Sequence, residues 1–313
     1  MVNLCFNKDE ICGLSEGLEY AGRVRGFKLS ENGVKVNVKK GKELRICGSG
    51  DAFNIEYESK TDFFRGVSML TGLLEKNEGS CDISQKAAFD MCGIMIDSSR
   101  NAVLKPEKVI DIIARTALMG LNTVMLYTED TYEVEGYEYF GYMRGRYTKE
   151  EIRKIDKAAH ALGVELIPCI QTLAHLRAAL RWGFADEIKD NEYILLADED
   201  KTYELIDAMF KSLRDMYSSK KIHIGMDEAH GVCMGKYLEK HGYQNRFDVL
   251  SRHVSRVCEI AKKYGFEPMM WSDMFFRIAS KTNDYYDMKA KVPDDLPAKI
   301  PENISMVYWD YYH

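Results

Sequence analysis

The chain has 313 residues, of which 46% are apolar, 11% aromatic and 29% charged, and its mean hydropathy is −0.33. These values exclude a disordered chain and a membrane-spanning protein, because the chain can bury a sizeable core and holds no apolar run of about 18 residues. A formal net charge of −6 argues against nucleic acid as a partner, since such proteins usually carry a basic face. Length alone favours about two domains.

The eight cysteines are spread along the chain without any C-x-x-C pair. This spacing lacks the usual signature of a zinc or thiol-redox site, and it predicts reduced, buried thiols. The N-terminus lacks a basic segment followed by a long apolar stretch, so no secretory signal is predicted. We therefore expect a cytoplasmic protein with no cofactor and no metal, whose oligomeric state the sequence does not fix.

Residues 1–87 are predicted to form a small α+β domain. A β-hairpin is expected over residues 23–38, because two β-like runs flank the Asn32-Gly33 step, a strong turn signal. Residues 61–74 carry apolar side chains at helical spacing and predict a helix. The small and polar residues 80–86 are expected to link this domain to the next one.

Residues 88–313 alternate apolar strand-like runs with amphipathic helical stretches, a pattern that indicates a parallel sheet. Six strands are predicted, over residues 89–96, 123–127, 165–170, 221–226, 267–271 and 304–309. Helices are predicted over residues 106–119, 149–162, 198–217 and 245–264. Gly120, Gly163 and Gly265 stand just past three of these helices, where a left-handed cap favours glycine.

Polar and titratable side chains follow nearly every predicted strand, which is typical of the active site of a (β/α)₈ barrel. A doubly wound sheet would instead concentrate its site at one switch point, and no G-x-G-x-x-G motif occurs. We therefore predict an α/β fold, a (β/α)₈ TIM barrel after the small domain. Because only about six of the eight βα units are visible, either two strands are cryptic or the chain is part of a longer one. An end directly after a strand favours the second possibility.

The most informative segment is KIHIGMDEAHG, residues 221–231, in which Asp227 and Glu228 follow a predicted strand. Successive side chains of a strand point to opposite faces, so the two carboxylates can serve one site only where the backbone turns. Gly225 and Gly231 permit such a bend. The alternative is an ordinary solvated acidic turn.

This segment resembles the H-x-G-x-D-E signature of the family-20 glycoside hydrolases, the β-N-acetylhexosaminidases. Residues 64–70 resemble the helix before the barrel of that family, residues 93–100 its first strand, and residues 147–168 its helix into strand three. His175 stands where the family has a histidine after a Pro-Gly turn, although Leu173-Ala174 precede it here. The D-D-x-x-x-W of the family appears as residues 128–132, TEDTY. The tyrosine and indole that the family takes from strands seven and eight are not found.

The resemblance implies exo-acting hydrolysis, with retention, of terminal β-linked N-acetylglucosamine or N-acetylgalactosamine from a small oligosaccharide or glycoconjugate. The acetamide of the substrate would form an oxazoline-type intermediate, a mechanism in which the enzyme supplies no nucleophile. Glu228 is then the general acid and base, and Asp227 accepts a hydrogen bond from the acetamide N–H. Arg100 would bind the 3- and 4-hydroxyls of the sugar through its planar fork.

The remaining candidates are substrate-binding residues. Trp271 and Trp309 end successive strands and are expected to form walls on which a sugar ring stacks, with core packing as the alternative. His175 and His223 are expected to orient the carboxylates. Asp130, with Glu129 beside it, is a candidate for contacts to outer hydroxyls or for a proton relay to His175.

Two other functions remain open. In one, the chain is a retaining glycosidase of another barrel family, with Glu228 as the acid and Asp273 or Asp310 as the nucleophile. In the other, it is a non-catalytic sugar-binding module. A metal site formed by His223, Asp227 and His230 is disfavoured, because no H-E-x-x-H motif or tight histidine and cysteine cluster occurs.

Overall fold

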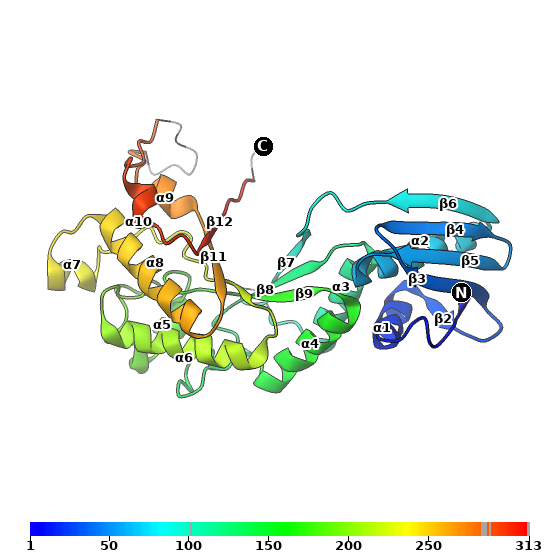
Figure 1. Cartoon of the computed structure of the whole chain (residues 1–313). Coiled ribbons are helices and arrows are strands. Elements are labelled where there is room, and N and C mark those ends of the chain that lie inside the picture. Colours follow the sequence, from blue (N-terminus) through cyan, green and yellow to red (C-terminus); the bar gives the residue numbers. More distant parts are fainter. Residues whose placement is uncertain (101, 283–286, 288, 312–313) are drawn as a thin grey trace. The chain divides into compact units, whose positions relative to one another are not determined.

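The computed structural model describes residues 1–100, 102–282, 287 and 289–311. The chain forms two compact units (Figure 1). The first comprises residues 1–96, 104–125 and 151–166, and the second comprises residues 97–103, 126–150 and 167–313. The domain boundary expected at residue 87 stays a prediction. Among the residues described, no helix has both the length and the apolar composition needed to cross a bilayer.

The first unit contains the expected small α+β domain, built on a six-stranded sheet with the order β2-β1-β3-β5-β4-β6. Its strands are β1 (Val2–Phe6), β2 (Phe27–Leu29), β3 (Val34–Lys40), β4 (Leu44–Ser49), β5 (Ala52–Tyr57) and β6 (Ser80–Gln85). Helix α2 (Lys60–Glu75) packs on β4 and β5, and α1 (Ser15–Arg25) packs beside it. Helix α3 (Pro106–Leu118) contacts both α1 and α2.

The hairpin predicted over residues 23–38 is wrong. Strand β1 lies between β2 and β3 and pairs in parallel with both of them. Gly33 does not serve a left-handed turn; the chain passes over β1 there, and a Cβ on Gly33 would lie 2.6 Å from the carbonyl carbon and oxygen of Asn3. Glycine is therefore needed for a close backbone approach, a requirement that an Asn-Gly step does not distinguish from a turn.

Helix α2 confirms the prediction for residues 61–74 and begins with a capping box. The Asp62 backbone N–H donates to Ser59 Oγ at 3.1 Å, and the Ser59 N–H donates to Asp62 Oδ2 at 2.8 Å. Such a cap stabilises a helix by about 1 kcal/mol. The linker predicted over residues 80–86 is wrong, because β6 pairs antiparallel with β4. β6 is an edge strand with no fully buried side chain, so its polar composition concealed it.

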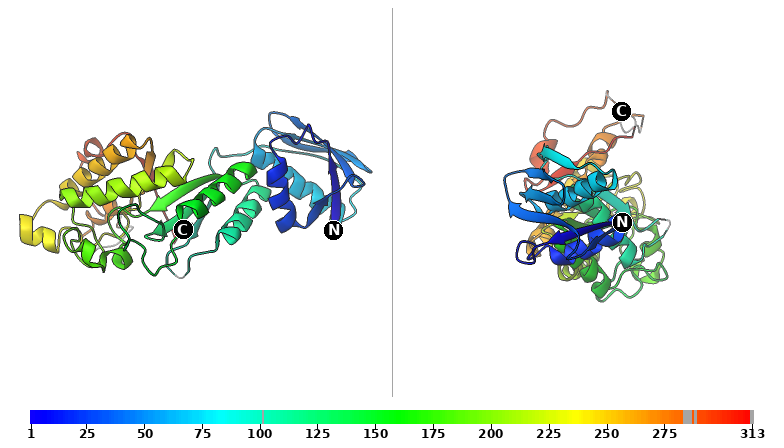
Figure 2. Two further views of the ribbon diagram at one scale, coloured as in Figure 1. Left: turned by 90° about the horizontal axis from the view of Figure 1, so that it is seen from below. Right: turned by 90° about the vertical axis from the view of Figure 1, so that its right-hand side faces the viewer.

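The second sheet is an incomplete (β/α)₈ barrel in which each strand neighbours the next along the chain. Its strands are β7 (Gly93–Asp97), β8 (Thr123–Glu129), β9 (Glu165–Ile170), β10 (Lys221–His223), β11 (Glu267–Trp271) and β12 (Ser305–Val307). The long helices after α3 are α4 (Lys149–Leu162), α6 (Asp200–Met216) and α8 (Arg246–Lys263). Helices α6 and α8 pack against each other (Figure 2). Within the described residues six of the eight barrel strands are present, as the sequence predicts.

Shorter elements fill the connections, and none of them was predicted. They are α5 (Arg177–Leu180), the 3₁₀ helix Gly183–Ala185, α7 (Lys236–His241), α9 (Asp273–Arg277) and α10 (Leu296–Lys299). Segments of three to six residues are too short to show a helical period. The caps predicted at Gly120, Gly163 and Gly265 are confirmed, with φ of 81°, 73° and 69°.

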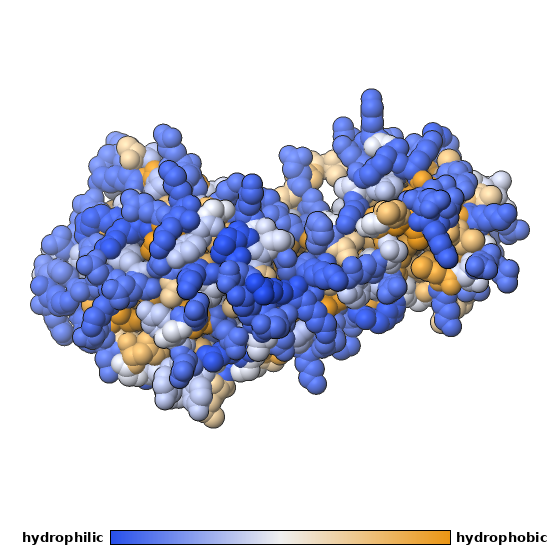
Figure 3. Space-filling view, turned by 60° about the horizontal axis from the view of Figure 1, so that its bottom comes forward, coloured by the Kyte–Doolittle hydropathy of each residue, from blue (hydrophilic) through white to orange (hydrophobic). Residues whose placement is uncertain are grey.

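All eight cysteines are free, as expected, but only some are buried. Cys169, Cys233 and Cys258 are buried, whereas Cys12 and Cys92 are exposed, which corrects the expectation that all of these thiols pack in the core. Hydrophilic residues cover most of the surface shown in Figure 3, in keeping with the high charged content of the sequence.

Candidate active site

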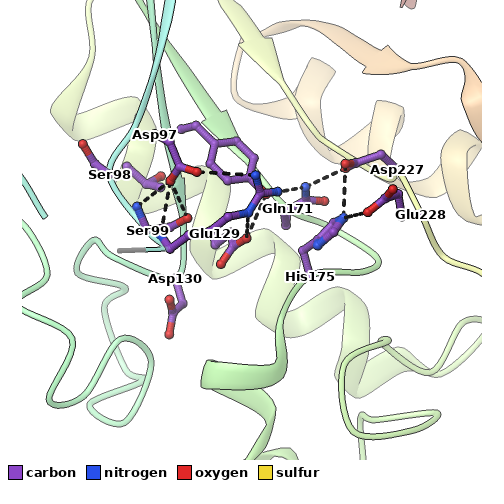
Figure 4. Close-up of polar contacts among 12 residues, drawn as sticks. Asp97, Ser98, Ser99, Glu129, Asp130, Gln171, His175, Asp227 and Glu228 are labelled. Atoms are coloured by element: carbon purple, nitrogen blue, oxygen red, sulfur yellow. Dashed lines mark hydrogen bonds and ion pairs between the residues drawn. The ribbon is translucent and has the colours of Figure 1, made fainter. Parts of the chain in front are cut away.

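Functional side chains from four consecutive strand ends meet within the second unit (Figure 4). Arg100 follows β7, Glu129 ends β8, and Gln171 and His175 follow β9. The Asp227-Glu228 pair follows β10. This carboxyl edge of the parallel strands is where barrel enzymes place their reacting groups.

The backbone bends sharply at the acidic pair, as predicted. Gly225, Met226 and Glu228 all adopt left-handed conformations, with φ of 71°, 73° and 52°. Gly231 lies outside that region, so two non-glycine residues make the rest of the bend. Each such residue costs of order 1 kcal/mol or more and persists only where its surroundings hold it. As a result both carboxylates point toward His175 (Figure 4).

His175 lies close to both acids. Its Nε2 lies 3.2 Å from Asp227 Oδ2 and 3.5 Å from Glu228 Oε2. Burial alone would lower the pKa of His175, but the hydrogen bond and the charge of Asp227 outweigh it and raise that pKa. Burial would likewise raise the pKa of Asp227, but His175 and Gln171 outweigh it, and this pKa is lowered. The protonated form of His175 and the ionised form of Asp227 therefore stabilise each other.

Gln171 holds the same carboxylate from the opposite side. Its side chain is fully buried, and its Nε2 donates to Asp227 Oδ1 at 2.7 Å and to the Tyr127 hydroxyl at 3.1 Å. Its Oε1 accepts from the Met226 backbone N–H at 3.1 Å. A Cβ on Gly225 would lie 2.1 Å from that oxygen, so glycine is required there. Gln171 thus fixes both the Asp227 carboxylate and the bent backbone that carries it.

Arg100 lies beside the acidic pair with about half of its side chain exposed. Its Nη2 donates to the Tyr127 hydroxyl at 3.3 Å, and its Nε lies 3.6 Å from Glu129 Oε1. The Tyr127 hydroxyl in turn donates to Glu129 Oε1 at 2.9 Å. Burial is the main cause of the raised pKa of Glu129. Because Tyr127 and Glu129 hold the Arg100 guanidinium, it is fixed in place, while its exposed part stays open to a ligand.

Asp130 is 1% exposed and lies apart from the acidic pair (Figure 4). Its Oδ1 accepts from Arg144 Nε at 3.2 Å, and Arg144 Nη2 donates to the Ser99 carbonyl at 2.7 Å. Burial is the main cause of its raised pKa. In the structure Asp130 positions Arg144, and its contact with a substrate stays a prediction.

His223 contacts backbone and an aromatic ring. It is fully buried, its Nδ1 accepts from the Gly225 N–H at 3.1 Å, and its ring packs on Trp271 with centroids 4.5 Å apart. Burial lowers its pKa to about 4, so the ring is neutral near pH 7. His223 therefore holds the backbone bend at Gly225 and does not contact the carboxylates directly. His175 is the histidine that contacts them.

Trp271 and Trp309 are both partly buried. Trp309 is connected to Glu228 through Asp273. The Trp309 side chain hydrogen-bonds to Asp273, whose Oδ2 also accepts from the Glu228 backbone N–H at 3.1 Å. Burial raises the pKa of Asp273 to about 6. Stacking of a sugar on either indole stays a prediction.

One group of side chains in the site has the spacing of metal ligands. Ligand atoms of His175, Asp227 and Glu228 all lie within 4.8 Å of one another, close enough to share a cation. The trio considered from the sequence, His223, Asp227 and His230, does not form such a group among the described residues.

A cavity of about 720 Å³ opens beside Arg100 and His175. It is lined by Arg100, Glu129, Arg144, His175, Arg177, Ala178, Arg181 and Tyr193. Its volume is typical of a site for a small ligand.

A sequence model described as glycosyl hydrolase family 20, catalytic domain, matches residues 89–310. The chain belongs to this family. Beta-hexosaminidase 3 of Arabidopsis thaliana is 25% identical over 242 residues, which cover 72% of this chain and 44% of that protein. Hexosaminidase D of Homo sapiens is 22% identical over 239 residues, which cover 73% of this chain and 46% of that protein. The family-20 chain thus spans about half the length of these curated relatives.

Solved family-20 structures share its fold. An exo β-N-acetylglucosaminidase from Vibrio harveyi in complex with N-acetylglucosamine aligns with a TM-score of 0.76 at 18% identity, covering 99% of this chain and 54% of that one. The β-N-acetylhexosaminidase from Streptomyces coelicolor aligns with a TM-score of 0.72 at 19% identity, covering 98% and 65%.

Several residues of this family-20 site have no role that the sequence alone predicts. Tyr127 lies inside a predicted strand, and no motif marks it. Arg144 follows β8, whereas Arg177 begins α5 and Arg181 follows it. No periodicity assigns these residues to a common cavity. Gln171 is among the polar side chains that the sequence places at strand ends, but its role was missed because its partners, Tyr127 and Asp227, come from other strands.

Proposed function

We propose that this chain acts as an exo β-N-acetylhexosaminidase, which hydrolyses terminal β-linked N-acetylglucosamine or N-acetylgalactosamine with retention. The observation that carries the proposal is the unequal environment of two adjacent carboxylates around His175. The Asp227 side chain is 14% exposed and its pKa is lowered, whereas the Glu228 side chain is 39% exposed. One carboxylate is suited to remain an anion and the other to exchange protons with a substrate.

The chemistry follows from these two roles. The acetamide oxygen of the bound sugar attacks its own anomeric carbon, while Glu228 gives its proton to the leaving glycosidic oxygen as that bond breaks. Asp227 accepts from the acetamide N–H and offsets the positive charge that develops on the resulting oxazolinium ring. Glu228 then takes a proton from water, which attacks the anomeric carbon and reopens the ring. Two inversions at that carbon give net retention.

The surroundings of Asp273 support this mechanism over an enzymatic nucleophile. Asp273 is 7% exposed, and its carboxylate is engaged by the Glu228 backbone and the Trp309 side chain. A nucleophile must reach the anomeric carbon of the substrate. The Asp273 carboxylate is instead bound to the backbone N–H of Glu228, the general acid. Asp273 is therefore better suited to positioning Glu228.

Glu228→Gln tests the proposal in the full-length protein. We expect turnover of an aryl β-N-acetylglucosaminide by the wild type, and a loss of about 10²–10⁴-fold in the variant when the leaving group is poor. A leaving group with an acidic phenol needs little protonation and should lose much less. Glu135→Gln, at an exposed acid paired with Lys211, is the matched control and should keep full activity. Equal losses on both substrates would contradict the role of Glu228, and wild-type turnover of a β-glucoside alone would contradict the function.

We further propose a reducing, cytoplasmic location for the protein, supported by eight free cysteines. Carbohydrate is the proposed partner, either an oligosaccharide or a glycoconjugate.

A further inference from the structure

We propose that the loop after β9, which includes the short helix α5, forms a binding site for a negatively charged second sugar, next to the terminal N-acetylhexosamine. The site is built from Arg177, Arg181 and Trp182, and the inference rests on the proposed function. Loops that follow barrel strands border the active site, so this loop lies at the edge where the carboxylates converge.

The cavity beside the acidic pair is basic, although the chain as a whole has a net charge of −6. Four arginines line it, against a single carboxylate, that of Glu129. Two of the arginines are committed to acids of the site: Arg100 to Asp97 and Glu129, and Arg144 to Glu129 and Asp130. The other two belong to the loop after β9.

These two loop arginines are available to a ligand. Arg177 pairs with Glu192, and both side chains are about two-thirds exposed, so the pair is weak and easily exchanged. Arg181 has no hydrogen bond or ion pair with any residue that the structure describes, and its guanidinium lies 4.6 Å from the centroid of the Trp182 ring. The charge of Arg181 acts on the nearby Asp130 carboxylate without forming an ion pair with it. An exposed cation of this kind in a cavity favours an anionic ligand.

Trp182 adds a flat apolar surface next to the two cations. Its ring contacts Tyr139 at 5.5 Å and Tyr142 at 5.3 Å, and the two tyrosine rings lie 5.3 Å from each other. Tyr139 is 50% exposed and Tyr142 is 44% exposed, in the loop after β8. The two exposed tyrosine rings and the partly buried indole, all in mutual contact, offer a face on which the C–H groups of a pyranose can pack.

The ligand class follows from combining these features. A sugar ring would pack on the aromatic face while its carboxylate accepts from the guanidinium groups of Arg177 and Arg181. The same cavity reaches Arg100 and His175, so the terminal sugar and the charged one are neighbours in a single substrate. A uronic acid on the leaving-group side of the scissile bond fits this arrangement.

The test uses two disaccharides that differ in one group: N-acetylglucosamine β-1,4-linked to glucuronic acid, or to glucose. For the full-length wild type we expect kcat/KM to be about 5- to 30-fold higher for the charged substrate, from two partly screened charge contacts. The preference should shrink in 0.5 M NaCl, because salt screens exposed charges. In the Arg177→Gln, Arg181→Gln double variant the ratio of the two kcat/KM values should fall to about one.

Arg256→Gln is the matched control, since Arg256 also lies over an aromatic ring, that of Tyr203, but does not line the cavity. It should keep the preference of the wild type. Equal kcat/KM values for the two disaccharides in the wild type, or a preference that survives in the double variant, would overturn the inference alone if the wild type still cleaves an aryl β-N-acetylglucosaminide. Loss of that aryl activity in the wild type would overturn the proposed function and the inference together. The single variant Arg181→Gln should give an intermediate ratio, which guards against misfolding of the double variant.

Discussion

Replacing Gln171 by Met tests how the site is held together. The change keeps the length and approximate volume of a fully buried side chain and removes its polar atoms. Three hydrogen bonds are lost, to the Asp227 carboxylate, to the Tyr127 hydroxyl and from the Met226 backbone. The Met226 N–H is left in a fully buried segment without its acceptor.

The magnitude follows from the partners. A hydrogen bond to a charged group contributes about 1.5–3 kcal/mol, and each neutral one about 0.5–1.5 kcal/mol, with a further cost for a buried donor left without a partner. We therefore expect the free energy of unfolding to fall by about 3–6 kcal/mol. Asp227 keeps His175 but loses its second anchor, so kcat/KM should also fall by about 10²-fold through misplacement of the carboxylate.

Urea unfolding and turnover of an aryl β-N-acetylglucosaminide measure the two effects. Gln244→Met is the matched control, because the Gln244 side chain is exposed and reaches only the His241 carbonyl, at 3.4 Å. It should change stability by less than about 0.5 kcal/mol. If Gln171→Met unfolds completely, Gln171→Glu gives a second test, since a carboxylate facing Asp227 should cost more stability as the pH rises. A Gln171→Met protein with wild-type stability and activity would refute the reasoning.

Four further predictions concern neighbouring groups. Gly225→Ala should destabilise the fold by about 2 kcal/mol or more in urea unfolding, because its Cβ would meet Gln171 Oε1 and the left-handed φ disfavours alanine. Asp273→Asn should raise the free energy of unfolding at pH 7 by about 1–3 kcal/mol, since the native carboxyl has a pKa of about 6 against 3.8 and its ionised form is penalised. The raised pKa of His175 contributes stability below pH 6.5 that is lost as the pH rises through the native value, and the lowered pKa of Asp227 contributes stability above pH 3.8 that is lost as the pH falls. The free energy of unfolding, measured against pH, should therefore include a contribution from His175 and Asp227 between these two limits, and Asp227→Asn should remove it. The same pH profile in the wild type and the variant would contradict the pairing of His175 with Asp227. Dialysis against EDTA should leave turnover of the aryl glycoside unchanged, whereas a loss restored by one divalent ion would show that His175 and Asp227 hold a metal.

The sequence predicted the barrel well because its signals are local. Apolar runs and helical periods fix β9 and α4 within one residue or less, and glycine marks the ends of three helices. The errors arose where one residue pattern serves two structures. Gly33 allows a backbone crossing instead of a turn, and the polar composition of β6 belongs to an edge strand instead of a linker.

The candidate site divides in the same way. Asp227 and Glu228 could be predicted because they are adjacent in the chain and follow a strand. His175 and Gln171, which lower the pKa of Asp227, both follow β9, and only the fold brings them within hydrogen-bonding distance of it. His175 and Arg100 were found through resemblance, whereas the other cavity arginines carry no signal in the sequence; they are Arg144, Arg177 and Arg181.

The central claim is that the acetamide oxygen of the substrate is the nucleophile. Aryl β-N-acetylglucosaminides bearing zero to three fluorine atoms on the acetyl group measure this, because each fluorine weakens the carbonyl oxygen as a nucleophile. If Asp227 and Glu228 support attack by that oxygen, kcat/KM falls steeply with each fluorine added. A rate that is nearly independent of fluorination, together with covalent labelling of Asp273 or Asp310 by a 2-fluoro sugar, would contradict the account.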